Sequence, residues 1–332
     1  MKKIFMLLGL VFILSGCGKY NDKNLVKDIS KKVNDSKGYH MTATLEIFRN
    51  EEKYSYDVDS SYKKGDFFKV DLVNQNNNHE QIILKNDEGV YVLTPSLNKS
   101  FKFQSDWPYN NSQIYLLQPI LKDLQNDKNL KFKKLKNEYI FTSRVNYTND
   151  KNLKNQKVYF DKDINLKRVE VFDTDNQVVM RLKVTKISKG NNFDDNYFNL
   201  DYYSDNSNDN NKTKINNKTQ KTSTTNETLY PMYVPSDTYL NTQDVMATSS
   251  GNTTILTFTG NSPFTFVQSS VSDSINYVDG EPSFVLDSIG AVNDHSVSWV
   301  SNNKEYYLTS DVVSASELLM IADSLSVTEV GK

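Results

Sequence analysis

The sequence predicts a mainly β fold of the α+β class, in which two antiparallel meanders precede a small second domain. Tyr and Phe number 20 and 17 while Gly and Pro number only 12 and 7, a composition that favours ordered strands. Apolar and polar residues alternate along 39–103 and again along 131–189. A polar stretch at 201–228 has no large apolar run and separates the meanders from the rest of the chain.

The first expected element is a helix. The segment NLVKDISKKVNDSKGY places Leu25, Ile29 and Val33 at four-residue intervals, with charged residues between them, and ends at Gly38. This spacing predicts a short amphipathic helix that ends at a glycine. Six strands are expected after it: MTATLEIF, KYSYDVDSSYKK, DFFKVDLVN, EQIILKN, GVYVLTP and SFKFQS.

The middle of the chain combines a helix with a second meander. In NNSQIYLLQPILKDLQND the apolar residues share one side of a helix, which Pro119 is expected to kink or to divide into two short helices. Five strands should follow: KFKKL, EYIFTSRVNYT, QKVYFDK, LKRVEVFDT and QVVMRLKVTKISK.

The part beyond the polar stretch predicts a compact α+β unit. Its strand-like runs are TTILTFTG, FTFVQSSV, SVSWVSNN and KEYYLTS. Ser314 and Glu317 then form a capping box in front of LLMIADSL, which predicts the start of a helix.

The N-terminus reads as a processing signal. Lys2 and Lys3 precede an apolar run at 4–14, which is too short to remain as a membrane-spanning helix, and Ser15-Gly16 lead to Cys17. The sequence LSGC resembles the bacterial lipobox, which implies a diacylglyceryl group on Cys17 and cleavage before it. An ordinary secretory signal and a buried structural cysteine are the rival interpretations. Because Cys17 is the only cysteine, no intrachain disulfide is possible.

These signals divide the chain into five parts. We expect a lipoprotein signal peptide at 1–16, a lipidated tether at 17–23, the large β domain at 24–200, a flexible linker at 201–228 and the small α+β domain at 229–332.

The net charge of −2 hides an asymmetry between these parts. From residue 229 onward the chain carries a net charge of −10, which leaves +8 for the residues before it. Near an anionic bilayer the front of the chain would be attracted and the back repelled. Unselected drift of surface charge explains the asymmetry equally well.

The order of helix, six strands, central helix and five strands resembles the LolA/LolB/RseB superfamily of lipoprotein carriers. The stretch at 158–187, followed by FDDNYFNL at 193–200, is similar to the family's closing strands. GVYVLTPSLNKSFKFQSDWP resembles the LolA-like sporulation and germination lipoproteins of spore-forming Gram-positive bacteria. The resemblance covers about 24–200, and 229–332 resembles a small domain of unassigned function that follows it in such proteins.

This resemblance implies a fold and a ligand class. The fold would be an incomplete antiparallel LolA-like half-barrel with a helical lid, whose apolar inner face receives acyl chains in the carriers. A lipid anchor on the chain itself departs from the soluble carriers, and this departure argues against transport between two membranes.

The sequence contains no recognised motif for catalysis, cofactor binding or metal binding. His40, His79 and His295 are the only histidines, and none has a partner at metal-ligand spacing. The sequence has no G-x-S-x-G, Walker or dinucleotide-binding motif. Carboxylates are abundant, so an enzyme acting through an unrecognised carboxylate pair stays a distant third hypothesis. We expect no cofactor, no metal and no nucleic-acid partner.

Five aromatic residues are candidates for a cavity or a partner surface. Tyr91, Phe101, Phe103 and Tyr115 would line an acyl-binding cavity, although ordinary core packing is the favoured alternative. Trp107 would anchor a partner or pack beneath the lid.

Two functions follow from these observations. The first is a non-catalytic binding or scaffolding lipoprotein on the extracytoplasmic face of the cell membrane. It would serve sporulation or germination by docking an envelope protein, such as a cell-wall-modifying enzyme. The second is a chaperone that shields an acyl chain or a lipoprotein in the half-barrel.

Overall fold

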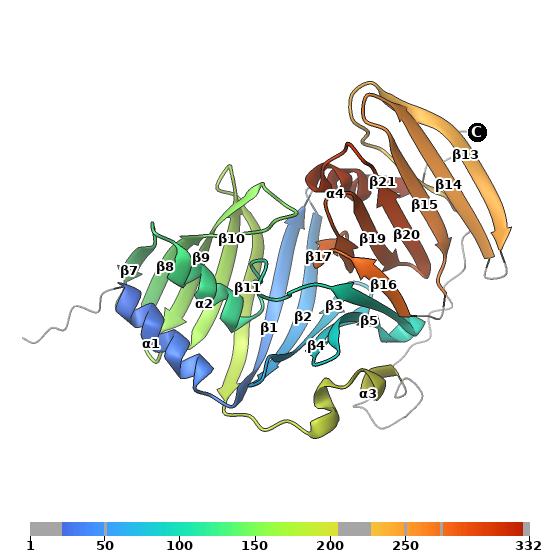
Figure 1. Ribbon diagram of the computed structural model, residues 1–332. Coiled ribbons are helices and arrows are strands. Elements are labelled where there is room, and N and C mark those ends of the chain that lie inside the picture. The colour runs from blue at the N-terminus through green and yellow to red at the C-terminus, as the bar shows by residue number, and fades with distance from the viewer. Residues whose placement is uncertain (1–21, 50–51, 205–226, 249–250, 273–274, 328–332) are drawn as a thin grey trace, which may run out of the picture.

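Figure 1 shows the computed structural model, which describes residues 22–49, 52–204, 227–248, 251–272 and 275–327. The expected signal peptide and Cys17 lie outside the described residues, as do most of the expected tether and linker. No helix in the described part of the chain is long and apolar enough to cross a membrane.

A twelve-stranded sheet contains both predicted meanders, in the order β16-β6-β5-β4-β3-β2-β1-β11-β10-β9-β8-β7. The meanders join where β1 pairs with β11, which sets Leu45 opposite Leu182. The strands of the first meander are β1 (Gly38–Arg49), β2 (Glu52–Lys63), β3 (Phe67–Asn74), β4 (Glu80–Asn86), β5 (Gly89–Thr94) and β6 (Lys99–Gln104). Those of the second are β7 (Lys131–Lys134), β8 (Glu138–Arg144), β9 (Leu153–Asp161), β10 (Leu166–Asp173) and β11 (Val178–Lys189).

Strict alternation gives this sheet an apolar inner face. On β1 the residues Met41, Ala43, Leu45 and Ile47 are buried in one core, while the residues between them point to the opposite side. The sheet remains open, because β16 and β7 are its two edges and do not pair with each other. The predicted mainly β, incomplete barrel is therefore confirmed, and we call residues 22–204 the half-barrel.

Two helices, α1 (Asp22–Asn34) and α2 (Leu117–Asn126), form the lid over the inner face (Figure 1). Leu25, Ile29 and Val33 of α1 are buried in the half-barrel core, as their spacing predicts. The backbone N–H of Leu117 donates to the Tyr39 hydroxyl at 3.1 Å. Since the first N–H groups of a helix have no partner inside it, this tyrosine on β1 fixes where α2 begins.

The prediction for Pro119 was wrong in one respect. Residues 110–116 are not helical, and α2 begins only at Leu117, so Pro119 lies in the first helical turn. A proline there removes no intrahelical hydrogen bond, because an N–H in the first turn has no carbonyl partner. The helix is consequently neither kinked nor divided.

The closing segment of the half-barrel covers part of the outer face. The 3₁₀ helix η2 (Asp195–Phe198) and helix α3 (Leu200–Ser204) place Phe198 and Tyr203 in a second core with Ile82, Leu84 and Tyr91 of β4 and β5. The cover therefore extends over β3 to β5, whereas the described elements leave the outer face of β7 to β11 open.

The C-terminal lobe, which we define as the described residues of 227–327, contains a seven-stranded antiparallel sheet in the order β13-β14-β15-β20-β19-β18-β17. Its strands are β13 (Thr238–Thr248), β14 (Gly251–Gly260), β15 (Phe264–Ser270), β17 (Glu281–Val285), β18 (Ser288–Val292), β19 (Ser296–Ser301) and β20 (Lys304–Thr309). Helix α4 (Ala315–Asp323) packs on one face, and the short strands β12 (Leu229–Pro231) and β21 (Leu325–Val327) pair beside it.

One strand leaves this lobe and joins the other sheet. β16 (Ile275–Asp279) pairs in parallel with β6, and Tyr277 is the partner of Lys102. A parallel pair requires a long connection, and here the partners are about 175 residues apart in the chain. The sequence patterns did not predict β13, β16, β17 or β18.

The predicted start of α4 at Ser314 is confirmed, whereas the Glu317 side chain accepts a hydrogen bond from the Tyr233 hydroxyl. Ser314 is the N-cap residue, and its hydroxyl accepts a hydrogen bond from the backbone N–H of Glu317. Ser314→Ala should lower the free energy of unfolding by about 1 kcal/mol, because that N–H loses its acceptor. Ser236→Ala, in an exposed turn of the same lobe, should be nearly neutral. Equal effects of both substitutions in urea unfolding would show that the cap contributes nothing.

Candidate functional site

The junction between the half-barrel and the C-terminal lobe contains several buried or partly buried polar contacts between residues far apart in the chain. Its central ion pair joins Lys99 Nζ on β6 to Glu305 Oε1 on β20 at 2.6 Å. The Lys99 side chain is completely buried, and its Nζ also donates to the Ser272 hydroxyl at 3.2 Å. A buried cation of this kind needs a carboxylate supplied by the other lobe.

Further contacts fix the C-terminal lobe on the loop ends of the half-barrel. Arg49 Nη1 lies 3.2 Å from Asp323 Oδ1 at the end of α4. Burial raises the pKa of Asp323, although the Arg49 guanidinium opposes this shift. The side chain of Gln81 accepts from the backbone N–H of Ile289 and donates to its carbonyl at 3.1 Å, as a neighbouring strand would.

We call the opening of the half-barrel core beside Tyr56 and Tyr115 the mouth of the half-barrel, and a side chain of the C-terminal lobe fills it. Phe284 of β17 packs against Tyr56 and Tyr115, with ring centroids 5.6 and 6.3 Å apart. Beside it remains a hollow of about 60 Å³, also lined by Met180 and Leu319. This space is far below the roughly 300 Å³ at which small-molecule sites begin.

The structure does not bring the five predicted aromatic residues to one surface. All are at most 4% exposed. Phe101, Phe103, Trp107 and Tyr115 belong to the half-barrel core, whereas Tyr91 lies in the second core on the outer face. Their role as a cavity or a partner surface stays a prediction, although Tyr115 lines the small hollow and Phe101 lines a larger groove.

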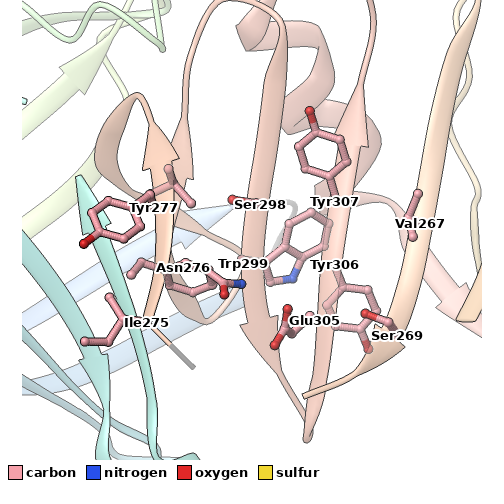
Figure 2. Close-up of a pocket in the computed structure, with 12 residues that line it drawn as sticks. Val267, Ser269, Ile275, Asn276, Tyr277, Ser298, Trp299, Glu305, Tyr306 and Tyr307 are labelled. Carbon is pink, nitrogen blue, oxygen red and sulfur yellow. The ribbon is translucent and has the colours of Figure 1, made fainter. Parts of the chain in front are cut away.

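That groove lies between β16 and the C-terminal sheet and has a volume of about 420 Å³. Figure 2 shows Ile275, Asn276 and Tyr277 along one side, with Ser298 and Tyr307 across from them. Tyr277 is 74% exposed and Tyr307 is 44% exposed, so both rings are accessible. β16 is an edge strand of the twelve-stranded sheet, so the groove lies along a sheet edge.

The groove continues onto an open face of the C-terminal sheet. Odd-numbered residues of β14, β15 and β20 share this face, because Thr257 pairs with Thr265 and Thr265 with Thr309. The even-numbered residues point into the core under α4. The open face is rich in Thr, Ser and Tyr, and it includes Tyr239 of β13, which is 63% exposed. We call this surface, with the groove, the tyrosine face.

The strand that exposes Tyr277, β16, has only a weak signal in the sequence. INYVD is only five residues long and has no alternating apolar pattern, but it is followed at once by Gly280, whose backbone φ is +114°. Asp279-Gly280 is a turn sequence that ends a strand. The strand was therefore detectable, whereas its distant partner β6 was not.

One further hollow contains a carboxyl group in an unusual state. Asp123 on α2 accepts hydrogen bonds from the Ser112 hydroxyl at 2.7 Å and from the Gln156 amide at 3.0 Å. Burial raises its pKa to about 6, and the two hydrogen bonds oppose this shift only in part.

No group of three or more His, Cys, Asp or Glu in the described part of the chain is placed to hold a metal ion.

Comparisons with known proteins place the chain in a family. No family model matches the sequence. Over 331 residues it is 33% identical to the sporulation protein YdcC of Bacillus subtilis (strain 168), covering 97% of this chain and 96% of that protein. The chain belongs to the family of this sporulation protein. The predicted resemblance to sporulation proteins is thereby confirmed.

Solved structures show weaker likenesses. A chain of the Pseudomonas aeruginosa MucA/MucB complex is 9% identical, with 92% of this chain and 98% of that chain covered and a TM-score of 0.33. The LolA superfamily protein from Nitrosomonas europaea is 10% identical, with 53% of this chain and 98% of that chain covered and a TM-score of 0.31. A chain of the Clostridioides difficile CwlD amidase–GerS lipoprotein complex is 18% identical, with 52% of this chain and 95% of that chain covered and a TM-score of 0.29. At such scores these likenesses carry no functional argument.

The junction ion pair can be tested by removing its cation. Lys99→Met should lower the free energy of unfolding by about 3 kcal/mol, because Glu305 then keeps a buried charge without its lysine. The double variant Lys99→Met/Glu305→Gln should recover part of this loss, since no charge is left unpaired. Lys102→Met, on the same strand but on the outer face, should cost less than about 1 kcal/mol. A double variant as unstable as the single one in urea unfolding would contradict the ion-pair argument.

The raised pKa of Asp123 predicts a pH dependence of stability. Between about pH 4 and 6 the unfolded chain loses this proton before the folded chain does, so folding stability falls as the pH rises. Asp123→Asn keeps an acceptor for Ser112 and should raise the free energy of unfolding at pH 8 by about 2 kcal/mol. At pH 4 the difference should vanish. Asp175→Asn, in an exposed turn, serves as the control, and a pH-independent effect of Asp123→Asn would refute the assignment.

Proposed function

We propose that this protein is a membrane-anchored lipoprotein that serves sporulation or germination as a non-catalytic binding protein. It docks a protein partner at the cell envelope through the tyrosine face. A cell-wall-modifying enzyme is one partner that would need to be held at this position. Membership of a sporulation protein family supports the biological context.

The observation that carries the proposal is the exposure of Tyr277 and Tyr307 along the groove, with Tyr239 exposed on the same face of the C-terminal sheet as Tyr307. The cores of protein interfaces are enriched in tyrosine and depleted in charge. On this surface Glu305 is already neutralised by Lys99, and hydroxyl groups and aromatic rings are the main recognition groups beside the exposed Asp244. Tyrosine and serine together provide rigid contact area and adaptable hydrogen bonds.

The anchor is assigned to Cys17 from the sequence LSGC. Two acyl chains on this residue suffice for stable attachment, because each buried methylene group contributes about 0.8 kcal/mol. The half-barrel would then stand on the extracytoplasmic side of the cell membrane.

The alternative function, an acyl-chain or lipoprotein chaperone, finds less support. It requires an apolar cavity in the half-barrel, whereas the described mouth holds Phe284 and a hollow of about 60 Å³. An acyl chain would have to displace β17 before it could enter.

The decisive experiment captures partners with the lipidated full chain from envelopes of sporulating cells. Wild-type protein should retain a specific protein partner, and Tyr277→Ser/Tyr307→Ser should weaken its binding by at least ten-fold. Tyr202→Ser is the matched control, because Tyr202 is similarly exposed on α3, away from the tyrosine face.

Two outcomes would overturn the proposal. Recovery of lipid without any protein would favour the chaperone function, and equal losses for the double variant and the Tyr202 control would remove the tyrosine face from recognition. Mass spectrometry of the mature N-terminus tests the anchor separately, with a diacylglyceryl group on Cys17 as the expected result.

A further inference from the structure

The outer face of β7 to β11 carries a dense group of cations. Strand pairing puts them on one side of the sheet, since Lys131 pairs with Thr142, Thr142 with Lys157, and Arg168 with Lys183. Phe132, Phe141 and Val158, at the intervening positions, point into the core. The outward cations of these strands are Lys131, Lys133, Arg144, Lys157, Arg168, Arg181, Lys183 and Lys186. We call this surface the basic face.

Carboxylates neutralise only part of this charge. Glu170 lies 3.0 Å from Arg181 Nε and 3.7 Å from Arg168 Nε, and Glu46 of β1 lies 3.1 Å from Lys183 Nζ. Within the described residues no carboxylate pairs with Lys131, Lys133 or Lys157, and all three are exposed.

Two of these cations lie over aromatic rings of the same face. Lys157 Nζ lies 4.7 Å from the centroid of Phe172, and the guanidinium carbon of Arg168 lies 3.9 Å from that of Tyr159. A cation over a ring retains its full charge while its outer side faces solvent. The basic face is therefore open, positively charged and backed by apolar groups.

The place of this face relative to the N-terminus suggests what covers it. Figure 1 shows α1 at the β7–β8 end of the twelve-stranded sheet and the C-terminal lobe at the other end. Cys17 precedes Asp22, where α1 begins, by five residue steps, which span at most roughly 18 Å. A lipid anchor on Cys17 must therefore hold the bilayer close to this end of the sheet.

We propose that the basic face is a contact surface for an anionic lipid bilayer, which orients the anchored half-barrel and directs the acidic C-terminal lobe away from the membrane. The inference rests on the lipidation of Cys17 given in the proposed function. Lysine near an anionic membrane surface is attracted by the headgroups, and the part of the chain from 229 onward, with its net charge of −10, is repelled. A lipid anchor alone limits the distance between the half-barrel and the bilayer, but it does not determine which face of the half-barrel turns toward the bilayer.

The test uses the chain from residue 18 onward, which retains every described residue and removes the anchor. Binding is measured by co-sedimentation with vesicles of phosphatidylglycerol and phosphatidylcholine in roughly a 1:2 ratio, and with pure phosphatidylcholine vesicles. We expect binding to the anionic vesicles only, weakening as salt increases. Lys131→Gln/Lys133→Gln/Lys157→Gln should reduce the affinity by roughly five-fold per lysine, on the order of a hundred-fold together.

The matched control is Lys27→Gln/Lys31→Gln/Lys32→Gln, which removes the same charge from the exposed side of α1, near the same end of the sheet. This control should keep most of the affinity, and thermal unfolding of both triple variants excludes a folding defect. Equal losses in the two triple variants, or no preference for anionic vesicles, would overturn the proposal. So would self-association without vesicles that the basic-face variant abolishes, because a second copy would then occupy the face. Since this chain has no anchor, the result is independent of partner capture and of the modification of Cys17.

Discussion

The pairing of β16 with β6 is the constraint on which the arrangement of the molecule depends. These five residues extend the half-barrel sheet by one strand supplied from the C-terminal lobe. The pairing holds β19 and β20 beside the edge of the half-barrel, where Glu305 reaches Lys99. It also forms one wall of the groove, so this part of the tyrosine face exists only while the two lobes are joined. The backbone hydrogen bonds between β16 and β6 therefore hold the two lobes together and also build the groove.

Charge is distributed along the molecule in a way that reinforces this arrangement. The basic face lies on β7 to β11, at one end of the twelve-stranded sheet, and the acidic lobe lies at the other. At the junction between them two ion pairs, Lys99 with Glu305 and Arg49 with Asp323, cross from one lobe to the other. The exposed charges outside these pairs stay available for partners of opposite sign.

Local patterns in the sequence predicted the half-barrel well, because its strands pair with their neighbours in the chain and alternate strictly. The helix containing Leu25 and the cap at Ser314 followed from equally local rules. The misses have physical reasons. β13 is exposed on both sides apart from Thr238, so no alternation marks it, and β16 pairs with residues far away in the chain. The candidate site was harder to predict. Core packing was already the favoured interpretation of Tyr91, Phe101, Phe103 and Tyr115, and their burial agrees with it, whereas the exposed Tyr277 was not among the candidates.

Phe284 in the mouth of the half-barrel has a thermodynamic consequence for any visiting ligand. Because it belongs to the same chain, its local concentration at Tyr56 and Tyr115 is independent of dilution and is of millimolar order or higher. A visitor must compete with this resident side chain, and its apparent dissociation constant rises by the reciprocal of the fraction of molecules whose mouth is vacant. Apolar molecules that bind weakly or are scarce are thereby excluded from this space.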